Sequence, residues 1–211
     1  LFPYTTLFRS ASNDPMKMKG KKVAIFNGDP NYLAYIVSKK EKLNYNIVRC
    51  TSHINLFLSG AIDATMATSY NEYLQLLQSG FKLGDESIYR FSQHGYNIQE
   101  QGVYVKRSYY RDHAKACQKF AAATRLGWEW VAEHPEEALK IVMKYVRSDH
   151  AATNLTLQRR MLQEVLNLQL DADSKKREFR VRRDMVQKAN KLMIECGLLK
   201  RAVVFEELTV P

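Results

Sequence analysis

Short apolar runs alternate with helically spaced apolar residues over the first hundred residues of the chain. The run at residues 22–26 is typical of a buried parallel strand, and the spacing of Leu33, Ile36 and Val37 predicts a helix over residues 31–43. The same patterns predict further strands at residues 46–51, 63–68, 86–91 and 102–106, and further helices at residues 53–58 and 71–78. This alternation predicts an α/β fold whose mainly parallel sheet is covered on both faces.

After residue 106 the pattern changes to almost continuous helix. The first of these helices carries an apolar stripe made of Ala114, Cys117, Phe120, Ala121, Trp128 and Val131. Pro135, followed by two glutamates, marks the start of the next helix, and further helices are expected at residues 155–170 and 182–196. We therefore predict an α/β domain over residues 19–105 and a mostly helical domain over residues 106–211.

The net charge of +10 raises the question of nucleic-acid binding. The basic residues are spread along the chain and are densest at residues 175–183, with no nucleic-acid-binding motif beside them. A solvated basic surface explains them better, so we expect no nucleic-acid partner. No apolar run approaches the roughly 20 residues that a membrane-spanning helix needs.

Residues 1–10 match the translation of a common short-read library adapter, codon by codon, and we predict that they are an artefact. The natural sequence would then begin near Ala11, inside a longer gene. On that hypothesis a secretion signal and part of the fold precede the chain. Residues 1–10 were therefore excluded from the predicted fold.

Two polar clusters follow predicted strands, where open α/β sheets bind their ligands. Asn27, Gly28 and Asp29 follow the first strand, and their backbone could hold an anion or form a plain turn. In the second cluster, made of Tyr70, Asn71 and Glu72, helix capping by Asn71 and a dipole role for Glu72 explain the residues without a ligand.

Other chemistry has little support in the sequence. The five histidines show no ligand pairing, and the three cysteines lack metal spacing, so no metal site is expected. Cys117 and Cys196 are predicted to be small buried residues. No nucleophile elbow or other catalytic arrangement is present, so we expect a protein that is not an enzyme and needs no cofactor.

Several segments, taken in order from about residue 12 to residue 200, resemble the thiamine-pyrimidine-precursor type of ABC-transporter substrate-binding proteins. These segments are residues 12–23, 58–64, 70–73, 102–105, 127–128 and 134–138. The resemblance implies the two-lobed periplasmic-binding-protein type 2 fold, with ligand held between the lobes. Residues 19–102 would form the second lobe, and the helices from Asp112 would be the C-terminal half of the first lobe, whose N-terminal half would be missing.

The resemblance also implies roles for the two polar clusters. The second-lobe ligand contacts would fall on residues 27–29 and 70–72. Glu72 would accept hydrogen bonds from a ring amine, Asn71 would orient the ligand, and Tyr70 would stack on it. Many family members carry Trp after the first strand, where this chain has Phe26 and Asn27.

The function implied is capture of a small heteroaromatic nutrient and its delivery to an ABC permease in the membrane. Such a protein is periplasmic or extracellular, in some cases lipid-anchored, and monomeric when full length. One alternative is a pyrimidine synthase of the same fold, but its cysteine-rich iron motif is absent from this sequence. Another is a sensory domain of a signalling protein. A chain that lacks half a lobe would bind weakly and would expose apolar helix faces prone to aggregation.

Overall fold

The computed structural model describes residues 2–3, 6–9, 14–26, 32–51, 53–82, 84–170 and 176–209. The chain divides into two compact units. The first, here called the α/β unit, consists of Pro3–Gln99 and Val181–Pro211. The second, here called the helical unit, consists of Leu1–Phe2 and Glu100–Arg180.

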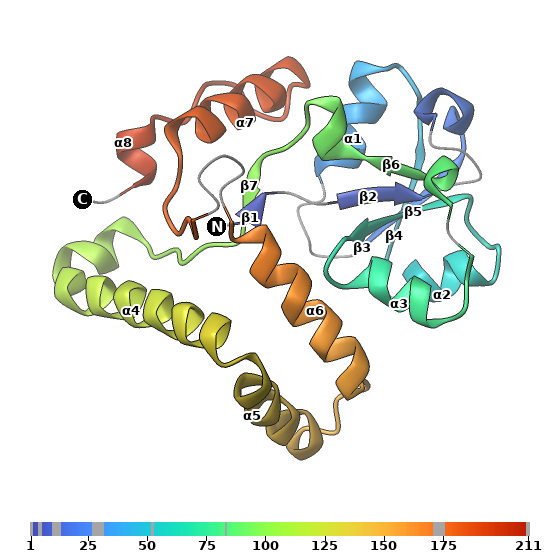
Figure 1. The fold of residues 1–211 in the computed structure, drawn as a ribbon. Coiled ribbons are helices and arrows are strands. Elements are labelled where there is room, and N and C mark those ends of the chain that lie inside the picture. Colours follow the sequence, from blue (N-terminus) through green and yellow to red (C-terminus); the bar gives the residue numbers. More distant parts are fainter. Residues whose placement is uncertain are drawn as a thin grey trace. The chain divides into compact units, whose positions relative to one another are not determined.

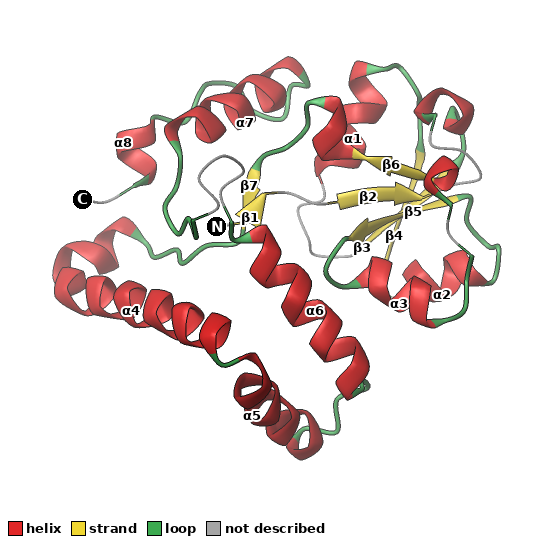
Figure 2. Ribbon diagram, viewed as in Figure 1, coloured by secondary structure: helices red, strands yellow, loops and turns green. Residues whose placement is uncertain are grey.

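The α/β unit is built on a five-stranded sheet with the order β4-β3-β5-β2-β6 (Figures 1 and 2). The strands are β2 (Thr6–Arg9), β3 (Lys22–Phe26), β4 (Asn46–Cys50), β5 (Ala64–Thr68) and β6 (Ile88–Arg90). Strand β3 runs parallel to β4 and β5, whereas β2 runs antiparallel to both β5 and β6. The predicted α/β fold with a mainly parallel sheet is confirmed.

Helices cover both faces of this sheet, as the alternating pattern predicts (Figure 1). Helix α1 (Tyr32–Lys40) lies on one face and contacts α7 (Arg183–Glu195). Helices α2 (His53–Leu58) and α3 (Glu72–Gln78) pack against β3 and β5 on the other face. The middle of β3 and nearly all of β5 are consequently buried, whereas both end residues of β3 are exposed. A short helix, α8 (Phe205–Leu208), follows α7.

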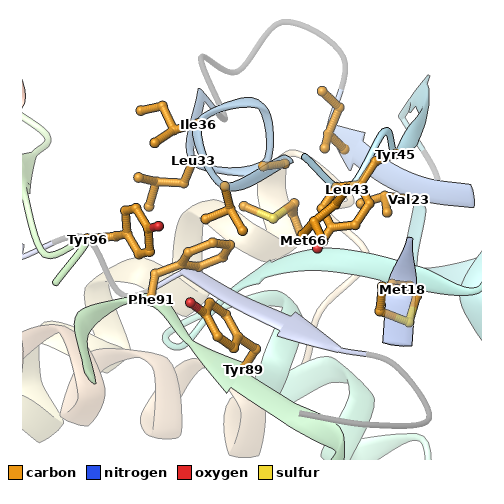
Figure 3. Packing of buried hydrophobic residues seen from close by; sticks show 14 of the residues in the cluster. Met18, Val23, Leu33, Ile36, Leu43, Tyr45, Met66, Tyr89, Phe91 and Tyr96 are labelled. Atoms are coloured by element: carbon orange, nitrogen blue, oxygen red, sulfur yellow. The ribbon is translucent and has the colours of Figure 1, made fainter. Parts of the chain in front are cut away.

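The main hydrophobic core lies between the sheet and α1 (Figure 3). Leu33, Ile36 and Val37 of α1 are fully buried there, in agreement with the helical spacing in the sequence. Two residues at the end of the chain, Leu192 and Cys196, belong to the same core. The predicted burial of Cys196 is therefore confirmed, whereas Cys117 is only half-buried.

The helical unit contains α4 (Arg107–Glu133), α5 (Pro135–Ser148) and α6 (Leu155–Leu168). Pro135 begins α5 as predicted. An ion pair joins α6 to α5, in which Arg159 donates to both carboxylate oxygens of Glu136 at 2.9 and 2.8 Å. No residue of α4 is buried, and Phe120, in its apolar stripe, is 62% exposed. The expected exposure of an apolar helix face is therefore present in the described chain; aggregation stays a prediction.

Two features of the fold differ from the expectations. Residues 102–106 do not form a strand; they are exposed and irregular, and the short strand β7 occurs just before them, at Gln99–Glu100. Thr6–Arg9 form strand β2, although residues 1–10 were excluded from the predicted fold. The presence of a strand does not reveal where these residues come from, so their adapter origin stays a prediction.

The two compact units differ from the predicted domains in where the C-terminal residues belong. The break at residues 99 and 100 lies near the predicted boundary at residue 105. The C-terminal residues 181–211, however, group with the α/β unit through the packing of α7 on α1. No helix in the described parts of the chain is long and apolar enough to cross a membrane.

Candidate functional site

A cavity of about 260 Å³ opens at the carboxyl ends of β3 and β5 in the α/β unit. Its lining residues come from three places: the end of β3, the start of α2, and the segment from β5 into α3. They are Phe26, His53, Met66, Ala67, Thr68, Tyr70, Asn71 and Glu72. The cavity thus contains all three residues of the predicted cluster at residues 70–72.

The topology of the sheet explains why the cavity lies at this edge. Strand β3 leads to α1 on one face of the sheet, whereas its neighbour β5 leads to α3 on the other face. Neighbouring strands that lead to helices on opposite faces mark a switch point of the topology, and the carboxyl ends of the strands there are the usual ligand position in open α/β sheets. The other predicted cluster, Asn27, Gly28 and Asp29, follows β3 directly but lies outside the described residues.

Glu72, the first residue of α3, is held by hydrogen bonds from its own segment. Its Oε2 accepts the backbone N–H of Thr68 at 2.8 Å and also the Thr68 hydroxyl. Its Oε1 accepts from Nδ2 of Asn71 at 3.0 Å. A carboxylate offers about four acceptor positions, so these three bonds fix its orientation and leave capacity for another donor. The carboxylate is therefore preorganised at the cavity wall.

Asn71 acts differently from the helix cap that its position suggests. It occupies the N-cap position of α3, but its side chain makes no capping hydrogen bond. Instead, its Oδ1 accepts from the Gln75 amide at 2.8 Å while its Nδ2 donates to Glu72. The interpretation of the Asn71 side chain as a cap is therefore wrong, because the neighbouring carboxylate and amide compete for it. Tyr70 is half-buried at the cavity wall.

His53 is a cavity residue that the sequence analysis did not single out. It begins α2, shortly after the end of β4, and its side chain is only 5% exposed. Its ring lies edge-on to Phe26, with the centroids 6.0 Å apart and the planes at 68°. Burial lowers the pKa of His53, and the negative charge of Glu72 opposes this shift only in part. The residue is therefore a neutral imidazole at physiological pH.

This pKa shift predicts a pH dependence of stability. The unfolded chain binds a proton at His53 below about pH 6.5, whereas the folded chain resists protonation until the pH is lower. Stability should therefore fall as the pH drops below about 6.5. Urea unfolding at about pH 7.5 and about pH 5.5 should show a smaller difference between the two pH values for His53→Phe than for the parent chain. An identical difference for the two proteins would contradict the prediction.

The site offers binding groups rather than a recognisable catalytic or metal centre. Among the described residues, no group of three or more His, Cys, Asp or Glu side chains could hold a metal ion. None of the three cysteines is among the described residues that line the cavity. What the cavity presents is a fixed carboxylate, a neutral imidazole, an amide, a phenol and an aromatic ring. These groups suit a small planar ligand that carries hydrogen-bonding atoms.

Solved structures with the same fold include periplasmic binding proteins. The periplasmic aliphatic sulphonate binding protein SsuA from Escherichia coli matches with a TM-score of 0.64 and 14% identity, over 99% of this chain and 65% of SsuA. Protein AF1704 from Archaeoglobus fulgidus matches with a TM-score of 0.54 and 15% identity, over 93% of this chain and 69% of AF1704. This chain therefore spans less than two thirds of the length of SsuA. The curated proteins give no match.

The sequence profile of the NMT1/THI5-like family matches residues 3–138 of this chain. The match covers all five strands of the α/β sheet, including β2, and every residue named above as lining the cavity. It also includes most of the ten residues for which an adapter origin is predicted. With the periplasmic-binding-protein fold established by the structural likeness, the chain belongs to the NMT1/THI5-like family.

Proposed function

We propose that this chain is the substrate-binding component of an ABC transporter and that it holds a small, uncharged heteroaromatic nutrient against the cavity at β3 and β5. The observation that carries the proposal is the fixed Glu72 carboxylate at the ligand edge of a periplasmic-binding-protein fold. A carboxylate accepts hydrogen bonds from a ring amine, and Asn71 and Tyr70 lie beside it to orient and cover the ring. A thiamine pyrimidine precursor is a ligand of this kind.

The charge of the cavity supports an uncharged or donor-rich ligand over an anion. SsuA is described as a sulphonate binding protein, and a sulphonate is negatively charged. Here no lysine or arginine occurs among the described lining residues, and the sequence from Asn27 to Asn31 adds an aspartate but no cation. An anion would meet the Glu72 carboxylate without compensation, which is unfavourable in a partly buried site.

The proposal extends to the role of the whole protein. Binding proteins of this fold release their ligand to a permease in the membrane, so a permease is the proposed partner and the periplasm or cell exterior the proposed location, with or without a lipid anchor. Closure around the ligand would then deliver it unchanged. We therefore propose a non-enzymatic function.

Calorimetric titration of the 211-residue chain with an aminopyrimidine thiamine precursor, and separately with ethanesulphonate, tests the proposal. The aminopyrimidine should bind and ethanesulphonate should not. Glu72→Gln should weaken binding about tenfold or more, because it removes a charged acceptor. Glu137→Gln, an exposed change on α5, should leave it unaltered. Binding of ethanesulphonate without binding of the aminopyrimidine would contradict the proposed ligand class.

A further inference from the structure

One ring nitrogen of His53 lacks a hydrogen-bond partner in the folded chain, as far as the structure describes it. Its Nδ1 is buried and has no hydrogen-bond partner within the described part of the chain. Buried polar atoms in folded proteins are nearly always paired, and an exception calls for a reason. His53 is one of the residues that line the cavity, and its covered Nδ1 would find the missing partner in a ligand that binds there and displaces the groups over it.

Packing within the fold fixes the position of the His53 imidazole. His53 is only 5% exposed, and its ring packs edge-on to Phe26 at the end of β3. Helix α2, which begins at His53, packs against β3 and β5. A ring held in this way loses little further freedom when a ligand binds, which favours selective recognition.

We propose that His53 is a specificity-determining contact of this cavity and that its Nδ1 pairs with a hydrogen-bonding atom at the edge of a planar ring ligand. This inference rests on the proposed function, because it assigns one more residue to the same site. A neutral imidazole offers one donor and one acceptor, whereas the Glu72 carboxylate offers only acceptors. Together they suit a ring edge that carries an amino group next to a ring nitrogen, as an aminopyrimidine does.

Two substitutions separate a polar role of His53 from a packing role. His53→Asn keeps a polar atom near the position of Nδ1 but removes the ring, whereas His53→Phe keeps a ring on Phe26 but removes both nitrogens. If the polar atom contacts the ligand, His53→Phe should lose affinity about tenfold or more, and His53→Asn should retain more of it. If the ring only packs, the order should be reversed.

The experiment is an NMR titration of the full 211-residue chain, labelled with ¹⁵N in its histidine rings, with 4-amino-2-methylpyrimidine as the probe. We expect the His53 Nδ1 resonance to move on saturation and the affinities to follow the order parent, His53→Asn, His53→Phe. His113→Phe, at an exposed position on α4, is the matched control and should bind like the parent.

The two hypotheses fail in different ways. If the parent chain binds the probe, but His53→Phe binds it equally well or the Nδ1 resonance does not move, the role of His53 is overturned and the proposed function stands. If the parent chain shows no binding of the probe at all, both the proposed ligand class and the role of His53 are overturned.

Discussion

The substitution Phe8→Pro is expected to remove most of the stability of the α/β unit. Strand β2 lies inside the sheet, where Phe8 is in register with Met66 of β5 on one side and with Tyr89 of β6 on the other. Proline has no N–H to donate, and its ring disturbs strands that are paired on both edges. We expect the loss to be a large part of the roughly 5–15 kcal/mol that keeps a domain folded.

Urea unfolding followed by far-ultraviolet circular dichroism measures this loss as a lower midpoint. The matched control is Phe8→Ile, which keeps the backbone N–H and places a strand-favouring residue at the same position. It should keep a midpoint much closer to that of the parent. Equal midpoints for Phe8→Pro and Phe8→Ile would show that the pairing of β2 contributes nothing to the folded state.

The expected loss does not depend on the origin of residues 1–10. Without β2, neither β5 nor β6 would have a neighbour on the edge that β2 now fills, and unpaired strand edges are prone to aggregation.

Elements whose side chains follow one clear period were predicted well. The apolar run at residues 22–26 forms β3, and Leu33, Ile36 and Val37 form the buried face of α1. The helix predicted at residues 53–58 has the same bounds as α2. In each case the local pattern and the burial in the fold agree, so the sequence alone was sufficient.

The errors arise where a segment needs a partner that the local sequence does not reveal. Residues 102–106 have the composition of a strand, but no strand pairs with them in the described chain and they stay exposed. The antiparallel strand β2 was not predicted because residues 1–10 were excluded as an adapter artefact, and its pairing with β5 joins residues about sixty positions apart. Long-range pairing of this kind carries little signal in a single sequence.

The candidate site was predicted in part. The cluster at residues 70–72 lies at the cavity, because its place after a buried strand puts it at the ligand edge of the sheet. The binding roles of these residues and of residues 27–29 stay predictions. His53 was not predicted as a site residue, because the histidines were considered only as metal ligands. Its place at the start of a helix, just after a predicted strand, was the signal that could have found it.

The second large effect is expected for Phe91→Ala, in the core between the sheet and α1 (Figure 3). The Phe91 side chain is 1% exposed. Its ring lies edge-on to Tyr89 at 5.3 Å and to Tyr96 at 6.1 Å between centroids. Truncation removes this apolar surface and leaves a cavity that the two tyrosines cannot easily fill, which typically costs about 3–5 kcal/mol.

Urea unfolding again provides the measurement, with Phe81→Ala as the matched control. Phe81 is 38% exposed and contacts Phe57, so its truncation opens no enclosed cavity and should cost about 1 kcal/mol or less. An unchanged slope with a lower midpoint would show that Phe91→Ala acts on stability rather than on the unfolding mechanism. Phe91 belongs to the same buried core as the apolar residues of α1. Equal losses for Phe91→Ala and Phe81→Ala would therefore mean that this core does not hold the α/β unit together.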